Sequence, residues 1–221
     1  HVCDVCQIGT SYVERAVANL SRTPKIVPLV PRRLPDVFDN VLTIAAELGA
    51  PERGVRHVAE ALARLKTLED VRVQAQAAPT RVMVMEWLDP IYNCGHWIPD
   101  QIERAGGLDP LAAPGGYSVP TAWDEVRRVN PEVLVVAPCG FDVARTTHEL
   151  GRLTERPGFA ELAAVRGGRV YAAHAELFTQ PSLSTLVLGT ELLAHFLHPT
   201  LFPAPEAARG RFAQVCLGGL P

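Results

Sequence analysis

The sequence predicts an α/β protein organised around a parallel or mostly parallel sheet. Short, continuous apolar runs at 81–85, 132–136 and 170–172 alternate with longer segments in which apolar residues recur every three or four positions. Continuous runs are typical of strands buried on both faces, and the longer spacing is typical of the helices that cover them. One helical segment before the first strand is unusually long, which indicates a second lobe. The chain has 221 residues, enough for one or two domains.

The first fifty residues contain two expected helices and one weak strand. Apolar spacing predicts a helix over 11–20. A β-branched run at 26–30 is a strand candidate that Pro28 weakens, because proline has no N–H to donate. A second helix is expected over 36–48, with Gly49 as its stop signal.

The long helical segment begins at Pro51, a residue that suits the first turn of a helix, and continues to about residue 77. About 27 residues at about 1.5 Å each span roughly 40 Å. A helix of that length joins two lobes more naturally than it fits into one layer. We therefore interpret it as a spine between lobes.

After Pro79 strands and helices alternate regularly. Gly106 is expected to end one helix, and Thr121 with Asp124 forms a capping-box pattern at the start of another. In parallel sheets ligands bind at the carboxyl ends of the strands, so function is expected in the loops that follow the three strands. The expected helices are 99–105, about 122–130, one from 142, one from 157 and 182–198, the last after an exit loop at 174–180.

Composition and charge exclude several classes of protein. The 21 basic and 24 acidic residues give a net charge of −3, so no nucleic-acid partner is expected. No apolar run approaches the ~20 residues of a membrane-spanning helix. The five cysteines are an odd number and do not indicate a disulfide framework. The chain opens without the basic and apolar regions of a signal peptide, and we expect part of the natural protein to precede it.

Aromatic residues gather in or beside the loops at the expected sheet edge. Any one of these rings can instead be a lid over the local core, but together they favour a wide apolar pocket with flat surfaces for a ligand. The chain has seven Phe, four Tyr and three Trp, and the five rings concerned are Trp87, Tyr92, Trp97, Phe141 and Phe178.

The cysteines leave alternatives open. Cys3 and Cys6 form a Cys-x-x-Cys pair that suits a redox site or half of a zinc site, while Cys94 and Cys139 fall in the first and second exit loops. Buried cysteines also need no function. The sequence contains no phosphate-binding glycine loop, nucleophile elbow or zinc-protease motif, so no enzyme activity and no catalytic cofactor are expected.

These patterns resemble the helical-backbone class (class III) of ABC-transporter substrate-binding proteins. The resemblance rests on the long helix, on the segment from Thr121-Ala-Trp-Asp-Glu-Val to Asn130-Pro131-Glu132, and on Pro157-Gly158-Phe159 through Arg169-Val170-Tyr171. Its cobalamin-binding branch is the most similar, through Glu86-Trp87-Leu88-Asp89-Pro90, Gly95-His96-Trp97 and Pro138-Cys139-Gly140-Phe141.

The resemblance implies two Rossmann-like lobes joined by the spine helix, with a corrinoid such as cobalamin held between them. It implies an incomplete N-terminal lobe at 1–50, a spine helix at 51–78 and a C-terminal lobe at 79–221. The implied partners are the transmembrane subunits of an ABC importer, and the protein is expected to be a monomer. The implied ligand-binding residues are Cys3, Asp4, Cys6, Trp87, Tyr92, Trp97, Phe141 and Phe178, and Glu161 is the implied transporter-docking residue.

Other interpretations stay open at this point. The same scaffold suits haem, an iron-siderophore or a cysteine-ligated metal, and Cys3 with Cys6 suits a thiol redox protein. If a corrinoid binds, Cys3, Cys6, Cys94 or His96 is a candidate axial ligand of its cobalt. The resemblance implies an extracytoplasmic location, in the periplasm or at the cell surface; the missing signal peptide and the unpaired cysteines favour the cytoplasm instead.

Overall fold

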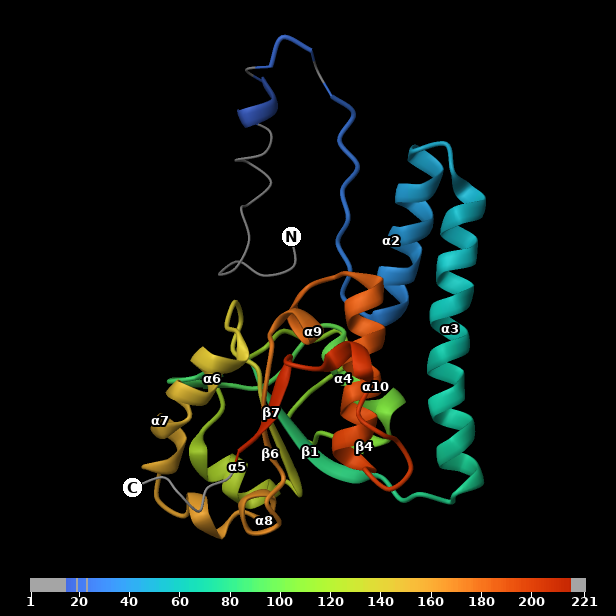
Figure 1. Ribbon diagram of the computed structural model, residues 1–221. Helices are drawn as coiled ribbons and strands as arrows, with labels where there is room; N and C mark the ends of the chain where they lie inside the picture. The colour runs from blue at the N-terminus through green and yellow to red at the C-terminus, as the bar shows by residue number, and fades with distance from the viewer. Residues whose placement is uncertain (1–14, 19, 23, 216–221) are drawn as a thin grey trace.

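The computed structural model describes residues 15–18, 20–22 and 24–215, and it shows an α/β lobe flanked by a long helical hairpin (Figure 1). The central sheet has the strand order β4-β1-β5-β6-β7. The first four strands are mutually parallel, and only β7 runs antiparallel to its neighbour. The predicted mostly parallel sheet is therefore confirmed. The strands are β1 (Thr80–Met85), β4 (Gly107–Leu108), β5 (Val133–Val136), β6 (Val170–Ala173) and β7 (Phe212–Gln214).

Side chains that alternate along the strands build two cores, one on each face of the sheet. On one face Val82 and Val135 belong to a cluster with α2 (Leu34–Glu47), α3 (Pro51–Gln74), α4 (Ile98–Ala105) and α10 (Leu183–Leu197). On the other face Met83 and Val136 pack in a second cluster. The sheet is thus covered on both faces, as its continuous apolar strands predict. The second cluster is covered by α5 (Trp123–Val129), α6 (Val143–Glu149), α7 (Gly151–Thr154), η1 (Phe159–Glu161) and α8 (Ala163–Arg166).

The helical hairpin consists of α2 (Leu34–Glu47) and α3 (Pro51–Gln74), which pack against each other. The predicted long helix is present, with 24 residues rather than about 27. Its lower part packs on α10 and α4, and the turn between α2 and α3 projects past the α/β lobe (Figure 1). Close packing of the hairpin depends on Gly54, since a Cβ there would lie 2.5 Å from Ala45 Cβ.

The chain that leads into α2 is anchored to the α/β lobe by a buried carboxylate. Asp100, in α4, accepts hydrogen bonds from the Arg33 guanidinium and from the Leu34 N–H at 2.9 Å. Arg32 lies 4.2 Å from the Tyr117 ring centroid and donates to its hydroxyl at 2.8 Å. These contacts fix the segment before α2 against α4 and the loop at 115–117.

Several local expectations differ from the structure. Residues 24–32 have no regular secondary structure, so the strand expected at 26–30 is wrong; Pro28 removes one of the N–H donors it would need, and Pro31 follows it directly. The capping box is also wrong, because the Thr121 hydroxyl donates to Val119 O and α5 begins after Ala122 with no side-chain cap.

Other differences concern helix length. The helix expected from 157 is divided into η1 and α8, and the exit loop at 174–180 contains a short helix, α9 (Glu176–Thr179). The helix expected over 11–20 falls mostly outside the described residues, and the structure describes a helical turn at 15–18. One further short helix, η2 (Glu206–Ala208), precedes β7.

Candidate functional site

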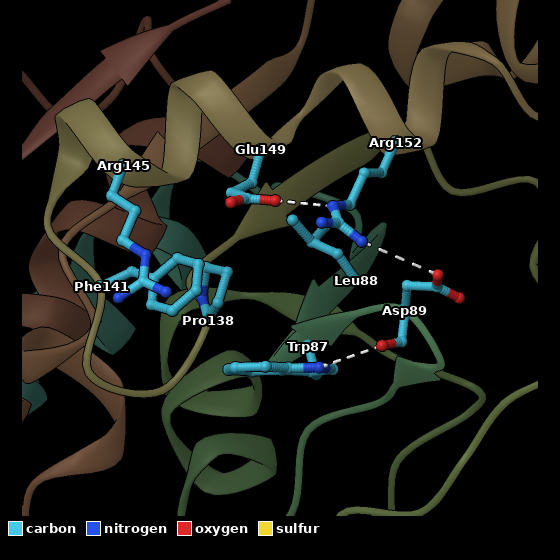
Figure 2. A pocket seen from close by; sticks show the side chains of 8 residues that line it. All are labelled: Trp87, Leu88, Asp89, Pro138, Phe141, Arg145, Glu149 and Arg152. Carbon is cyan, nitrogen blue, oxygen red and sulfur yellow. Dashed lines mark hydrogen bonds and ion pairs between the residues drawn. The ribbon is translucent and has the colours of Figure 1, made fainter.

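Two loops at the carboxyl edge of the sheet enclose a hollow. After β1 the chain forms a small hairpin of β2 (Trp87–Leu88) and β3 (Ile91–Tyr92), and after β5 it runs through a loop into α6. The two loops are joined by a hydrogen bond from Cys139 N–H to Glu86 O at 3.1 Å. The hollow comprises about 420 Å³ of space, open solvent included. Its lining residues are Trp87, Leu88, Asp89, Pro138, Phe141, Arg145, Glu149 and Arg152 (Figure 2).

Two aromatic rings form the apolar part of the hollow. The Trp87 side chain is 38% exposed, and its indole N–H donates to Asp89 O at 3.2 Å. Phe141 is mostly buried and meets Trp87 edge-on, with ring centroids 5.3 Å apart. This arrangement fixes the Trp87 ring while its exposed surface stays open to a ligand.

Charged side chains form the opposite rim of the hollow and mostly neutralise one another. The Arg152 guanidinium bonds the Glu149 carboxylate at 2.6 Å and lies 3.9 Å from the Asp89 carboxylate. Arg156 reaches the other oxygen of Asp89 at 3.3 Å. Arg145 is placed differently, because its guanidinium carbon lies 3.7 Å from the centroid of the Phe141 ring.

A buried carboxylate supports the hairpin from behind. Glu86 immediately precedes Trp87, and its carboxylate accepts hydrogen bonds from Gly95 N–H at 3.0 Å and from the Ser118 hydroxyl at 2.5 Å. Burial raises the pKa of Glu86, while both hydrogen bonds oppose that rise. A Cβ at Gly95 would lie 2.3 Å from Ser118 N, so the two loops can approach this closely only with glycine there.

A second buried acid lies near Cys94. Burial raises the pKa of Asp109 to about 6, against the hydrogen bonds that Leu111 N–H and Val84 N–H donate to its carboxylate. The Cys94 thiol lies 3.7 Å from the same carboxylate. Burial, together with that neighbouring charge, raises the pKa of Cys94 well above its usual value. Cys94 is therefore a neutral, buried thiol, which suits neither a nucleophile nor a thiolate ligand of cobalt.

The structure brings some of the predicted aromatic residues together and separates others. Trp87 and Phe141 meet in the hollow, and Tyr92 lies opposite Trp87 in the hairpin without lining the hollow. Trp97 and Phe178 belong to the core: they are 2% and 0% exposed, and the Trp97 indole N–H donates to Phe178 O at 2.6 Å. Neither of these two rings presents a face to a ligand, because both are lids over the local core.

The remaining predicted residues have separate positions. Cys3, Asp4 and Cys6 lie outside the described residues. His96 is 9% exposed and lies between the Trp97 and Tyr117 rings, away from the hollow. Cys139 is half-buried in the second exit loop. Within the part of the chain that the structure describes, no group of three His, Cys, Asp or Glu side chains could hold a metal ion.

Glu161 lies on the surface at the end of η1. Its side chain is 77% exposed, and the Arg127 guanidinium lies 4.0 Å from its carboxylate. An exposed carboxylate is accessible to a partner protein. The docking role of Glu161 stays a prediction.

Sequence reasoning missed the charged residues of the hollow. Arg145, Glu149 and Arg152 follow the second exit loop at positions i, i+4 and i+7, a spacing that places side chains on one face of a helical segment. That spacing, next to a loop at the carboxyl edge of the sheet, is the signal that could have identified them. Asp89 was expected near the site without a partner, and its position beside Arg152 depends on how the hairpin turns.

Comparisons with solved structures show the same fold. An ABC transporter substrate-binding protein from Listeria monocytogenes EGD-e is 11% identical, with a TM-score of 0.72 and coverage of 86% of this chain and 73% of that one. A periplasmic haem-binding protein from Pseudomonas aeruginosa is 16% identical, with a TM-score of 0.73 and coverage of 90% and 71%. The periplasmic vitamin B12-binding protein BtuF of Vibrio cholerae is 20% identical, with a TM-score of 0.60 and coverage of 84% and 69%.

The chain is shorter than the proteins it resembles. It spans between 57% and 73% of the length of the similar solved structures.

No curated protein sequence gives a match. Among the helices of the described residues, none combines the length and the apolar character needed to cross a bilayer.

The sequence profile of the family described as "Periplasmic binding protein" matches residues 10–177. The match includes the helical hairpin, β1, β5, β6 and both loops that enclose the hollow. It covers well over half of the 221 residues, and the chain therefore belongs to the periplasmic binding protein family.

Proposed function

We propose that this chain is the substrate-binding component of an ABC importer and that its ligand is cobalamin or a related corrinoid. The observation that carries the proposal is the hollow at the carboxyl edge of the sheet, where the Trp87 ring is held open to solvent by Phe141 and Asp89. Family membership supports transport rather than catalysis. The similarity to a vitamin B12-binding protein supports the choice of ligand.

The chemistry of a corrinoid suits this hollow. A corrin ring is broad and apolar on its faces, and its rim carries amide groups that form hydrogen bonds. An exposed indole offers a flat apolar contact, and the charged side chains opposite offer donors and acceptors for the rim. The hollow is too small to enclose a whole corrinoid, so in this proposal it receives one edge of the ligand. The N-terminal lobe, of which residues 1–50 are part, supplies the opposite wall of the cleft.

The proposal assigns a partner and a location. The transmembrane subunits of the importer are the partner, and the exposed Glu161 is the docking residue on this lobe. The protein works as a monomer outside the cytoplasm, as a periplasmic binding protein does. The α3 helix joins the two lobes and fixes their separation. A thiol redox function has no support, since the family consists of binding proteins.

Replacement of Trp87 tests the proposal. We expect Trp87→Ala to weaken the binding of cyanocobalamin by about tenfold or more, because truncation of a central tryptophan in a binding site commonly costs about 2 kcal/mol. Isothermal titration calorimetry measures the change. Leu108→Ala is the matched control, because Leu108 is an exposed apolar side chain in β4 that does not line the hollow. If circular dichroism shows that both proteins are folded and their affinities for cyanocobalamin are equal, the hollow is not part of the binding site.

A further inference from the structure

Arg145 occupies a distinct position among the charged residues of the hollow. It lies in the first turn of α6, its side chain is exposed, and its guanidinium is stacked on the Phe141 ring at 3.7 Å (Figure 2). Phe141 is itself mostly buried and fixed by its edge contact with Trp87. The guanidinium is therefore held in one place beside the proposed ligand surface instead of moving freely in solvent.

The charge of Arg145 is not balanced by an acid among the residues that the structure describes. Glu149 and Asp89, the two carboxylates that line the hollow, are bonded to Arg152 and Arg156. Among the described residues, no carboxylate oxygen comes within 4.0 Å of the Arg145 guanidinium, and none accepts a hydrogen bond from it. Asp142 accepts only from the main-chain N–H of Arg145, at 2.8 Å. The hollow thus contains a positive charge, placed over the Phe141 ring, whose side-chain N–H donors have no partner in the part of the chain that the structure describes.

We propose that Arg145 is a specificity-determining residue that selects ligands with an oxyanion on the rim of a flat macrocycle. This inference rests on the proposed function and goes further, because it names the ligand group that is recognised. A guanidinium carries its five N–H donors in its own plane, so stacking on Phe141 leaves these donors directed sideways. Two parallel donors match a phosphate or a carboxylate.

Two ligands supply this shared chemistry. Cobalamin carries a phosphodiester in its nucleotide loop, and cobinamide is the same corrin without that nucleotide and phosphate. Haem carries two propionates, which are neutral in its dimethyl ester. In each pair the macrocycle is unchanged and the oxyanion is lost. Cobinamide also lacks the ribose and the base, so the contribution of Arg145 is the part of the cyanocobalamin–dicyanocobinamide difference that disappears when Arg145 is replaced.

The experiment measures the affinity of the full chain for cyanocobalamin, dicyanocobinamide, haemin and haemin dimethyl ester by calorimetry or absorbance titration. Wild type is expected to bind cyanocobalamin about tenfold more tightly than dicyanocobinamide, as is typical of a charge-assisted hydrogen-bond pair. Arg145→Gln is expected to remove this difference and to leave the affinity for dicyanocobinamide unchanged. Arg145→Lys is expected to restore part of it, since lysine keeps the charge and loses the paired donors.

Arg56→Gln is the matched control, because Arg56 is an exposed arginine in α3 outside the hollow. The Arg145 inference is overturned if Arg145→Gln binds cyanocobalamin as tightly as wild type, while Trp87 remains necessary for binding. Haemin bound about tenfold more tightly than its ester, with no binding of either corrinoid, would keep Arg145 as the selecting residue and replace the proposed corrinoid by haem. If wild type binds none of the four compounds, both proposals are overturned.

Discussion

At the scale of single residues, Glu86 and Asp109 are two buried acids, and neither forms an ion pair with a cationic side chain among the described residues. Glu86 supports the hairpin that carries Trp87, and Asp109 accepts hydrogen bonds from the main chain of β1 and from Leu111. Burial raises the pKa of both carboxyls. Their ionised forms are tolerated because main-chain N–H groups and the Ser118 hydroxyl solvate them in place of water.

Asp109 makes the stability of the fold depend on pH. Its pKa is about 6 in the folded protein and about 3.8 in an exposed carboxyl, so folding favours the protonated form. The stabilisation from this proton is complete below pH ~4 and is lost as the pH rises through 6. Relative to Asp109→Asn, wild type is expected to lose up to about 3 kcal/mol of unfolding free energy between pH 4 and pH 8, at about 1.4 kcal/mol per pKa unit.

Urea unfolding of wild type and Asp109→Asn at a series of pH values measures that difference. Asp39→Asn is the control, because it makes the same substitution at an exposed aspartate on α2. A difference between wild type and Asp109→Asn that stays constant from pH 4 to pH 8 would show that Asp109 titrates normally.

Residue types alone could predict only part of the site. Trp87 and Phe141 were both expected in loops at the sheet edge, and their rings meet there: Trp87 comes two residues after β1 and Phe141 five residues after β5. Trp97 and Phe178 lie in similar stretches of sequence but begin or belong to short helices, whose first turns direct the rings into the core. The orientation of a ring in a loop depends on tertiary packing, which apolar periodicity does not encode.

At the scale of elements, the strands and the long helices were predictable and the irregular segments were not. Continuous apolar runs identified β1, β5 and β6, and Gly49 and Gly106 correctly marked the ends of α2 and α4. The strand expected at 26–30 failed because β-branched composition cannot replace a neighbouring strand. The long helix was predicted by its stripe of apolar residues, and its contact with α2 was not, since helix pairing depends on distant parts of the chain.

The α2–α3 contact gives a prediction at this scale. Gly54→Leu is expected to destabilise the fold by about 1–3 kcal/mol, because even a Cβ at this position would meet Ala45 Cβ at 2.5 Å and force the helices apart. Thermal and urea unfolding measure the loss. Ala59→Leu adds a similar side chain at an exposed position of the same helix and is expected to change stability by less than about 0.5 kcal/mol. Equal stability of Gly54→Leu and wild type would mean that α2 and α3 can move apart at Gly54 without a loss of stability, which contradicts the prediction.

At the scale of the whole molecule, our proposal makes the sheet, the hairpin and the hollow one side of a binding cleft. The carboxyl ends of the parallel strands meet at one edge, which places Trp87, Phe141 and Arg145 on the same surface. The helical hairpin extends past this edge, and in our proposal it carries the opposing lobe (Figure 1). The fold class followed from the sequence alone, whereas ligand identity depends on side-chain placement that only the structure shows.

The measurement that tests the central claim most directly is a titration of the wild-type chain with cyanocobalamin, haemin and a ferric hydroxamate siderophore under one set of conditions. The account predicts saturable, one-to-one binding of cyanocobalamin, tighter than that of the other two ligands and accompanied by a change in corrin absorbance. Absence of cyanocobalamin binding at high micromolar concentration, or tighter binding of the siderophore, would contradict it.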